Sequence, residues 1–66
     1  MRQVILTSKG ARLWSGEGVQ ALRSALVMTR KLWHNPVIMA GSKTIDHALD
    51  VQDGHGNVVG HIVRID

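Results

Sequence analysis

The sequence predicts an α+β fold in which one amphipathic helix packs on a mostly antiparallel sheet of four or five strands. Three observations support this fold class. A β-branched apolar run opens the chain, a long segment with helical periodicity follows, and two glycine-containing turn signals divide the C-terminal half into a three-stranded meander. The chain has 66 residues and no internal repeat or linker, so we expect a single small domain spanning residues 1–66.

The N-terminal segment is expected to form a β-hairpin. The run "RQVILT" (residues 2–7) is typical of a strand, and "SKGA" ends it with a loop in which Gly10 can take a positive φ. The run "RLWS" (residues 12–15) is expected to return as a second, short strand. Its Leu13 or Trp14 would then lie near Val4 and Ile5.

The segment from Ser15 to Pro36 carries the strongest helix signal. Ser15 is expected to be the N-cap, and Glu17 would lie near the positive end of the helix dipole. Asn35 and Pro36 should end the helix, because the residue before a proline is pushed out of helical geometry. We therefore expect a helix from about Gly18 to His34.

Apolar residues gather on one broad side of this helix when successive residues are turned by about 100°. That side consists of Val19, Leu22, Leu26, Thr29 and Trp33, widened by Ala21, Ala25, Met28 and Leu32. We expect Leu22, Leu26 and Trp33 to be buried against the sheet. The opposite side should expose Arg23, Arg30 and Lys31, with Val27 as the apolar exception.

The first turn of the predicted meander is Gly41-Ser42. A glycine at the first central position is typical of a two-residue type II′ loop. This loop would place Ile38 opposite Ile45 and Ala40 opposite Lys43.

The second turn is Gly54-His55-Gly56, a three-residue loop with glycine where a left-handed residue is needed. It would place Val51 opposite Val59 and Leu49 opposite His61, and Asp46 would face Arg64 across the ribbon. The two turns together predict one apolar sheet face, made by Ile38, Ala40, Ile45, Leu49, Val51, Val59 and Ile65.

Composition excludes several classes of protein. The chain has no cysteine, which excludes disulfides, thiolate metal sites and a cysteine nucleophile. No apolar run approaches the roughly 18 residues of a membrane span, and the N-terminal apolar run is too brief for a signal peptide. We expect a soluble, cytoplasmic protein with no membrane partner.

The C-terminal stretch "DVQDGHGNVVGHIVRID" holds aspartates and histidines around two glycines, and it could be a metal site, a catalytic site or a turn. A calcium loop fails because Val51 and Leu49 stand where oxygen ligands are required. A zinc site fails because only His47 and His61 would lie near one another, with His55 at the distant loop tip. The stretch is therefore predicted to be a hairpin without a metal ion.

Catalytic motifs are missing from the rest of the sequence as well. An Asp50–His61 pair can be drawn, but no serine lies in a nucleophile elbow and no phosphate-binding loop is present. We expect no catalytic residue and no cofactor, and therefore a protein that is not an enzyme.

Charge is distributed unevenly along the chain. The first 35 residues carry six cationic side chains against Glu17 alone, whereas the remainder carries two against four aspartates. This asymmetry predicts one basic surface that contacts nucleic acid or a nucleoprotein complex. The predicted partner-binding residues are Arg23, Arg30, Lys31, Lys9 and Arg12.

A protein partner is the alternative. Tiny cysteine-free α+β chains without catalytic motifs are common among phage and mobile-element accessory proteins, and some of these, such as anti-CRISPR proteins, inhibit by occluding a site on a larger complex. An exposed edge strand would also allow two copies to pair as a homodimer. No residue pattern in the sequence identifies a family.

Overall fold

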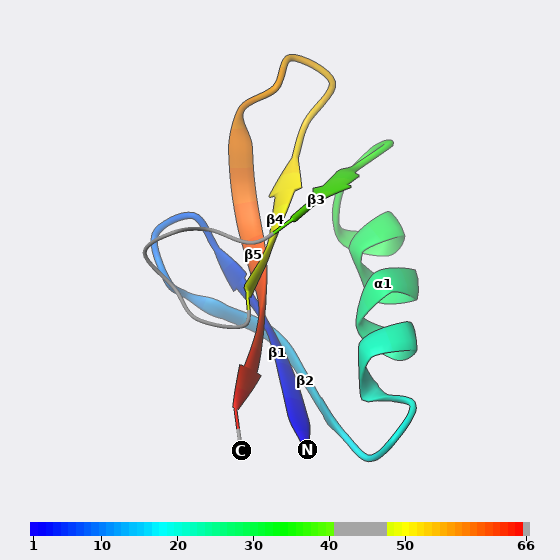
Figure 1. Cartoon of the computed structure of the whole chain (residues 1–66). Coiled ribbons are helices and arrows are strands. Elements are labelled where there is room, and N and C mark those ends of the chain that lie inside the picture. The colour runs from blue at the N-terminus through cyan, green and yellow to red at the C-terminus, as the bar shows by residue number, and fades with distance from the viewer. Residues whose placement is uncertain (41–47, 66) are drawn as a thin grey trace.

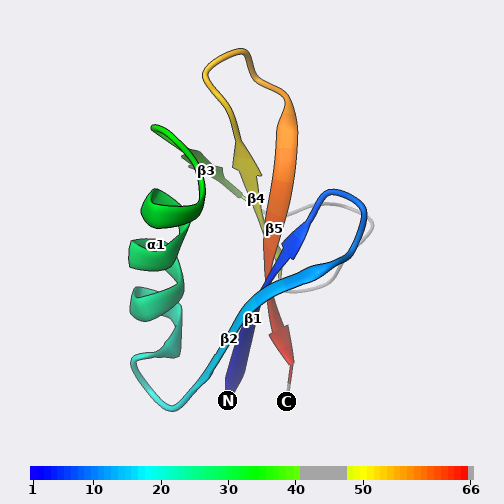
Figure 2. The ribbon, with the colours of Figure 1, turned by 180° about the vertical axis from the view of Figure 1, so that it is seen from behind.

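The structure, a computed structural model, describes residues 1–40 and 48–65. Its strands are β1 (Arg2–Thr7), β2 (Arg12–Glu17), β3 (Val37–Met39), β4 (Ala48–Gln52) and β5 (Val58–Ile65), and its helix is α1 (Ala21–Leu32). The strands form one antiparallel sheet in the order β2-β1-β5-β4-β3, and α1 lies along one face of it (Figures 1 and 2). This confirms the predicted α+β class, the helix on an antiparallel sheet and the closing meander.

A row of apolar side chains crosses the sheet beneath α1. Leu49 pairs with Ile62, Ile62 pairs with Ile5, and Ile5 pairs with Trp14, so that one row spans β4, β5, β1 and β2. Because residues directly opposite each other on paired strands point to the same side of a sheet, these four share one face. Together with Ala25 of α1 and Val51, the two isoleucines form the fully buried core.

The N-terminal hairpin follows the sequence prediction closely and extends it. The first strand has the predicted bounds, Gly10 has a φ of 90°, and Trp14 pairs with Ile5. The second strand runs on to Glu17, beyond the predicted end at Ser15. The predicted N-cap role of Ser15 and the helix-dipole role of Glu17 are therefore wrong, because both residues belong to β2.

The helix is shorter than predicted and presents a different line of residues to the sheet. It begins at Ala21 after the N-cap Gln20, whose side chain makes no capping hydrogen bond. Its buried residues are Ala21, Ala25 and Thr29, spaced by four, whereas Leu26 and Trp33 are partly buried against the core. Burial of Leu22 was predicted wrongly, since it is 41% exposed. Small side chains let the helix approach the sheet closely, which leaves the larger Leu22 and Leu26 at the flanks.

The two tryptophans pack on glycines. A Cβ on Gly16 would clash with the Trp14 ring, and a Cβ on Gly60 would meet the Trp33 ring at 2.7 Å and the Leu6 carbonyl oxygen at 2.6 Å. Each ring therefore rests where a glycine leaves the backbone uncovered. Trp33 follows directly after α1 and so ties the C-terminal end of the helix to β5.

The meander differs from the prediction in register. The structure pairs Ile38 with Val51, which overturns the predicted pairing of Ile38 with Ile45. The Gly41-Ser42 loop, Lys43, Ile45 and Asp46, the predicted partner of Arg64, lie outside the described residues. Between β4 and β5 a bulge follows the turn, so Val51 pairs with Gly60 and Leu49 with Ile62. The predicted pairs of Val51 with Val59 and Leu49 with His61 are each displaced by one residue.

Candidate functional site

The outer face of α1 is basic. Arg23, Arg30 and Lys31 are exposed on the side of the helix opposite the buried Ala21–Ala25–Thr29 line, as predicted. Within residues 1–40 and 48–65, an ion pair joins Arg2 to Glu17 and a hydrogen bond joins Asp50 to His61, and neither involves these three cations. We call Arg23, Arg30 and Lys31 the basic helix face. Val27 is 51% exposed and lies among them.

Lys9 and Arg12 do not join the basic helix face. Lys9 lies in the turn between β1 and β2, and Arg12 is the first residue of β2. Figures 1 and 2 place this turn on the far side of the sheet from α1. The five predicted partner-binding residues thus form two separate groups, because the hairpin carries its turn away from the helix.

The turn after β4 is organised by Asp53. Its Oδ1 accepts hydrogen bonds from the backbone amides of Asn57 at 3.0 Å and His55 at 2.8 Å. These two hydrogen bonds hold the pKa of Asp53 below its usual value, and the bond from Asn57 has the larger effect. Gly56 takes a φ of 83°, as the loop chemistry predicts. The aspartate and the glycines of this stretch therefore serve the geometry of a hairpin.

Asp50 and His61 meet across β4 and β5. The Asp50 Oδ1 lies 2.9 Å from the His61 Nδ1, and both side chains are less than one-fifth exposed. Since Ile62 faces α1, strand alternation places His61 on the opposite face of the sheet. No described serine or threonine hydrogen-bonds to this pair, so it lacks the nucleophile of a hydrolytic triad. The bulge in β5 brings the two residues opposite each other. Sequence reasoning named the pair, but without the bulge it placed Leu49 opposite His61.

Metal ligands do not gather in the part of the chain that the structure describes. No group of three or more His, Asp or Glu side chains is placed to hold a metal ion there. His47, which the sequence analysis weighed as a partner of His61, lies outside that part. No helix among the described residues is long and apolar enough to cross a membrane.

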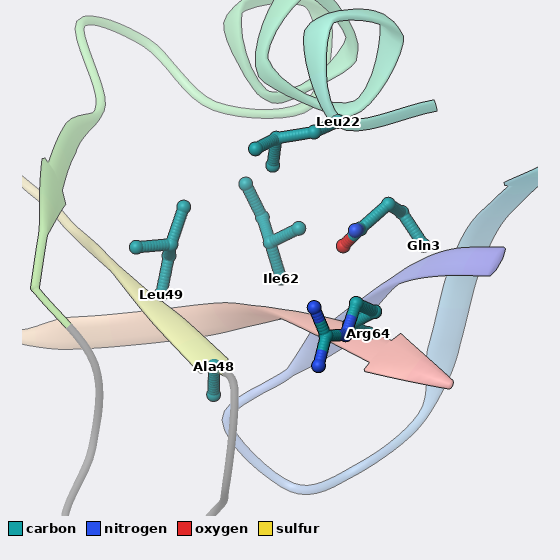
Figure 3. Close-up of a pocket in the computed structure, with 6 residues that line it drawn as sticks. All are labelled: Gln3, Leu22, Ala48, Leu49, Ile62 and Arg64. Carbon is teal, nitrogen blue, oxygen red and sulfur yellow. The ribbon is translucent and has the colours of Figure 1, made fainter. Parts of the chain in front are cut away.

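A cavity of about 290 Å³ lies between the first turn of α1 and the sheet. The described residues lining it are Gln3, Leu22, Ala48, Leu49, Ile62 and Arg64. Figure 3 shows Leu49 and Ile62 pointing from the sheet toward Leu22, with the amide end of Gln3 directed into the space between them. Sequence reasoning did not identify this cavity. The available signal was Gln3, a polar residue two positions from Ile5 and therefore on the inward side of β1.

Comparisons with known proteins show no relative: no family model, no curated protein and no solved structure matches the chain.

Proposed function

We propose that this protein is a small, non-enzymatic binding module that contacts nucleic acid or a nucleoprotein complex through the basic helix face. The observation that carries the proposal is the placement of Arg23, Arg30 and Lys31 on one exposed side of a helix, with no described carboxylate paired to them. A rigid helix with unneutralised cations attracts phosphates at little conformational cost.

The described side chains favour phosphate contacts over contacts with bases. Recognition of unpaired bases uses exposed aromatic rings. The sequence has no Phe or Tyr, and its two tryptophans, Trp14 and Trp33, both pack against the core. Contacts from arginine and lysine to the phosphate backbone carry little sequence information. We therefore expect sequence-independent binding that weakens as salt increases.

Two variants of equal charge change test the proposal. Arg23→Glu with Arg30→Glu removes two cations from the basic helix face, and Lys9→Glu with Arg12→Glu removes two from the β1–β2 hairpin. The probe is a mixed-sequence DNA duplex labelled for fluorescence anisotropy, titrated at several salt concentrations. The helix variant should bind much more weakly than wild type. It should also flatten the slope of log K against log salt by about one for each phosphate that the protein no longer neutralises.

The hairpin variant separates a local contact from a general effect of net charge. It should retain most of the binding, because its cations lie across the sheet from α1. Equal losses of affinity in the two variants would show that net charge alone attracts the duplex. Binding unchanged in the helix variant would contradict the proposed contact surface.

One observation favours the alternative, in which the partner is a protein. In that case the module would bind an acidic surface of a larger protein complex and inhibit the complex by occluding a site. Phage or mobile-element proteins of the anti-CRISPR type act in this way. Val27 exposes an apolar side chain among the cations, and apolar anchors within a charged rim are typical of protein interfaces. Val27→Ser keeps the charge and should leave duplex binding unchanged. Loss of a captured protein partner with Val27→Ser, without loss of duplex binding, would favour the inhibitor.

Homodimer formation stays a prediction. The sheet ends in two edge strands, β2 and β3, and edge strands present unpaired backbone groups to a second copy. Sedimentation equilibrium at several protein concentrations measures whether copies associate.

A further inference from the structure

We propose that two copies of this chain pair through β2 and form one continuous antiparallel sheet, with Gly16 at the two-fold axis. The described sheet ends at β2 and at β3, and the proposal specifies which edge pairs, in which register and with which side chains in contact. It goes beyond the proposed contact with nucleic acid and uses none of the residues of the basic helix face.

The β2 edge offers more backbone to a second copy than the β3 edge does. It runs over six residues, Arg12–Glu17, whereas β3 has three, Val37–Met39, and follows Pro36. Strand addition gains its affinity from main-chain hydrogen bonds, and proline has no backbone N–H to donate. Of the two described edges, β2 is therefore the better template.

Ser15 and Glu17 direct their backbone groups away from β1. Inside the hairpin, the amide of Gly18 donates a hydrogen bond of 3.0 Å to the Met1 carbonyl. Residues that bond to one neighbouring strand alternate along an antiparallel pair, so Gly16 also faces β1, and Ser15 and Glu17 face outward. Because β2 is an edge among the described strands, these two residues offer two donors and two acceptors to a second copy.

A two-fold axis at Gly16 uses all four of these groups in each copy. It sets Ser15 of each copy opposite Glu17 of the other, which gives four backbone hydrogen bonds between the copies. An axis at Glu17 would set two carboxylates opposite each other, which is unfavourable. An axis at Ser15 would bring Glu17 opposite Leu13, the residue that the β1–β2 bulge leaves unpaired.

On the face of the sheet away from α1, the side chains at this junction are complementary. Trp14 shares a face with Ile5, so strand alternation places Ser15 and Glu17 on the other face, where both are exposed. Within the described residues, Arg2 bonds to Oε1 of Glu17, so Oε2 can accept a hydrogen bond from the Ser15 hydroxyl of the other copy. The donor and the acceptor stand symmetrically about Gly16, which is why the chain matches itself.

On the α1 face, the partner would cover an aromatic ring. Trp14 is only partly buried, and its ring lies over Gly16, where a Cβ would clash with it. Pairing at Gly16 brings the second Gly16 and its ring alongside, so the two rings would meet over the paired glycines. Such contacts between aromatic rings stabilise association beyond the area that they bury.

This pairing has a consequence for the basic helix face. A two-fold axis perpendicular to the sheet leaves both copies of α1 on the same side of it. Both basic helix faces then point to that side, which doubles the cations that one duplex can meet. The consequence rests on the proposed function, whereas the pairing itself does not.

The experiment measures association in the absence of nucleic acid. Sedimentation equilibrium gives the dissociation constant, and amide hydrogen exchange at low and high protein concentration locates the contact. The amides of Ser15 and Glu17 should exchange much more slowly at high concentration, because hydrogen bonds to the second copy protect them. The amide of Asp53 is the control, since it bonds to the Asn57 carbonyl in the distant β4–β5 turn and should keep its rate.

Charge changes at Ser15 test the register. In Ser15→Glu the new carboxylate would face Glu17 of the other copy, and association should weaken about tenfold. In Ser15→Lys the ammonium would face the same carboxylate, and association should strengthen about threefold. Because the chain carries a net charge of +3, repulsion between whole molecules would produce the opposite order.

Val37→Glu is the matched control at the other edge. It makes the same change of charge on β3, at a side chain that is 45% exposed, and it should leave association unchanged. Each variant is first checked for native circular dichroism, so a change in association reports on the contact.

A monomer at every concentration would overturn the proposal, as would a dimer in which the Ser15 and Glu17 amides stay unprotected. A dimer that persists in Ser15→Glu and dissociates in Val37→Glu would place the contact at β3 and would overturn the pairing through β2. Since none of these samples contains nucleic acid, failure of the pairing and failure of the proposed function are distinguishable.

Discussion

The two ends of α1 pack on the sheet in different ways. At the C-terminal end, Thr29 is 1% exposed, its hydroxyl donates a hydrogen bond of 2.6 Å to the Leu26 carbonyl, and the Trp33 ring covers Gly60. At the N-terminal end, Leu22 is 41% exposed above a cavity, and the Gln3 carboxamide points into that cavity without a partner among the described residues. One end therefore fills its space and satisfies its polar group within the protein, whereas the other end leaves a cavity and has no hydrogen bond from Gln3 to a described residue. We therefore expect substitutions at the C-terminal end of α1 to cost more stability than substitutions at its N-terminal end.

Gly60→Ala is expected to have the largest effect on the C-terminal end. The added methyl group would lie 2.6 Å from the Leu6 carbonyl oxygen and 2.7 Å from the Trp33 ring, and a backbone neighbour cannot move away cheaply. We expect a loss of about 3 kcal/mol in the free energy of unfolding, against a total of roughly 3–10 kcal/mol for a chain of this length. Thermal unfolding monitored by circular dichroism should show a melting temperature lower by about 10 °C or more.

Gly54→Ala is the control for Gly60→Ala, since nothing lies within 4 Å of a Cβ at Gly54 and its φ is not in the left-handed range. Its melting temperature should remain close to that of wild type. Equal losses of stability in the two variants would mean that the Trp33 contact does not hold the helix end.

The fold could be predicted from the sequence wherever local chemistry determines it. The β-branched run at Arg2–Thr7 predicts a strand, and the glycines between Asp53 and Asn57 predict a turn. Both elements form as expected. The second strand was underestimated because "SGE" also resembles a helix N-terminus. Only the pairing of Ser15 with Val4 and Glu17 with Arg2 decides for a strand, and pairing is a property of the whole sheet.

The distance between the helix and the sheet determines which helix residues are buried, and the sequence does not give that distance. Helical periodicity locates the apolar side of α1 but does not show how near the helix comes to the sheet, so the buried line passes through Ala21 and Ala25 and not through Leu22. The same limit applies to the candidate sites. The exposure of Arg23, Arg30 and Lys31 followed from the helix pattern, whereas the cavity depends on the spacing between elements.

Leu26→Ala and Leu22→Ala compare two leucines that were both expected to be buried. Leu26 packs against the core, so truncation should cost about 2 kcal/mol, near the lower end of the range for buried leucines. Leu22 is partly exposed beside an existing cavity, and its truncation should cost less than about 1 kcal/mol. Urea unfolding followed by tryptophan fluorescence measures both, and a larger loss of stability for Leu22→Ala would contradict the comparison.

Thr29→Val tests the satisfied polar group at the C-terminal end. Valine has nearly the same shape, so the main change is loss of the hydrogen bond to the Leu26 carbonyl. We expect a loss of about 1 kcal/mol in urea unfolding. Thr29→Ser keeps the hydroxyl and removes a methyl group, and its crystal structure should retain the bond. A Thr29→Val protein as stable as wild type would show that the hydroxyl contributes nothing.

Gln3→Leu is the matched change at the N-terminal end, and its expected effect is the smallest. The Gln3 carboxamide is directed into the cavity and makes no hydrogen bond to a described residue. The change therefore breaks no bond to those residues and replaces a polar group by an apolar one of similar size. We expect stability in urea to be unchanged or higher by up to about 1 kcal/mol. Gln20→Leu is the control, because Gln20 is exposed and its side chain makes no capping bond, and it should leave stability unchanged. If Gln3→Leu instead loses more stability than Thr29→Val, the carboxamide stabilises the fold, and the contrast between the two ends of α1 does not hold.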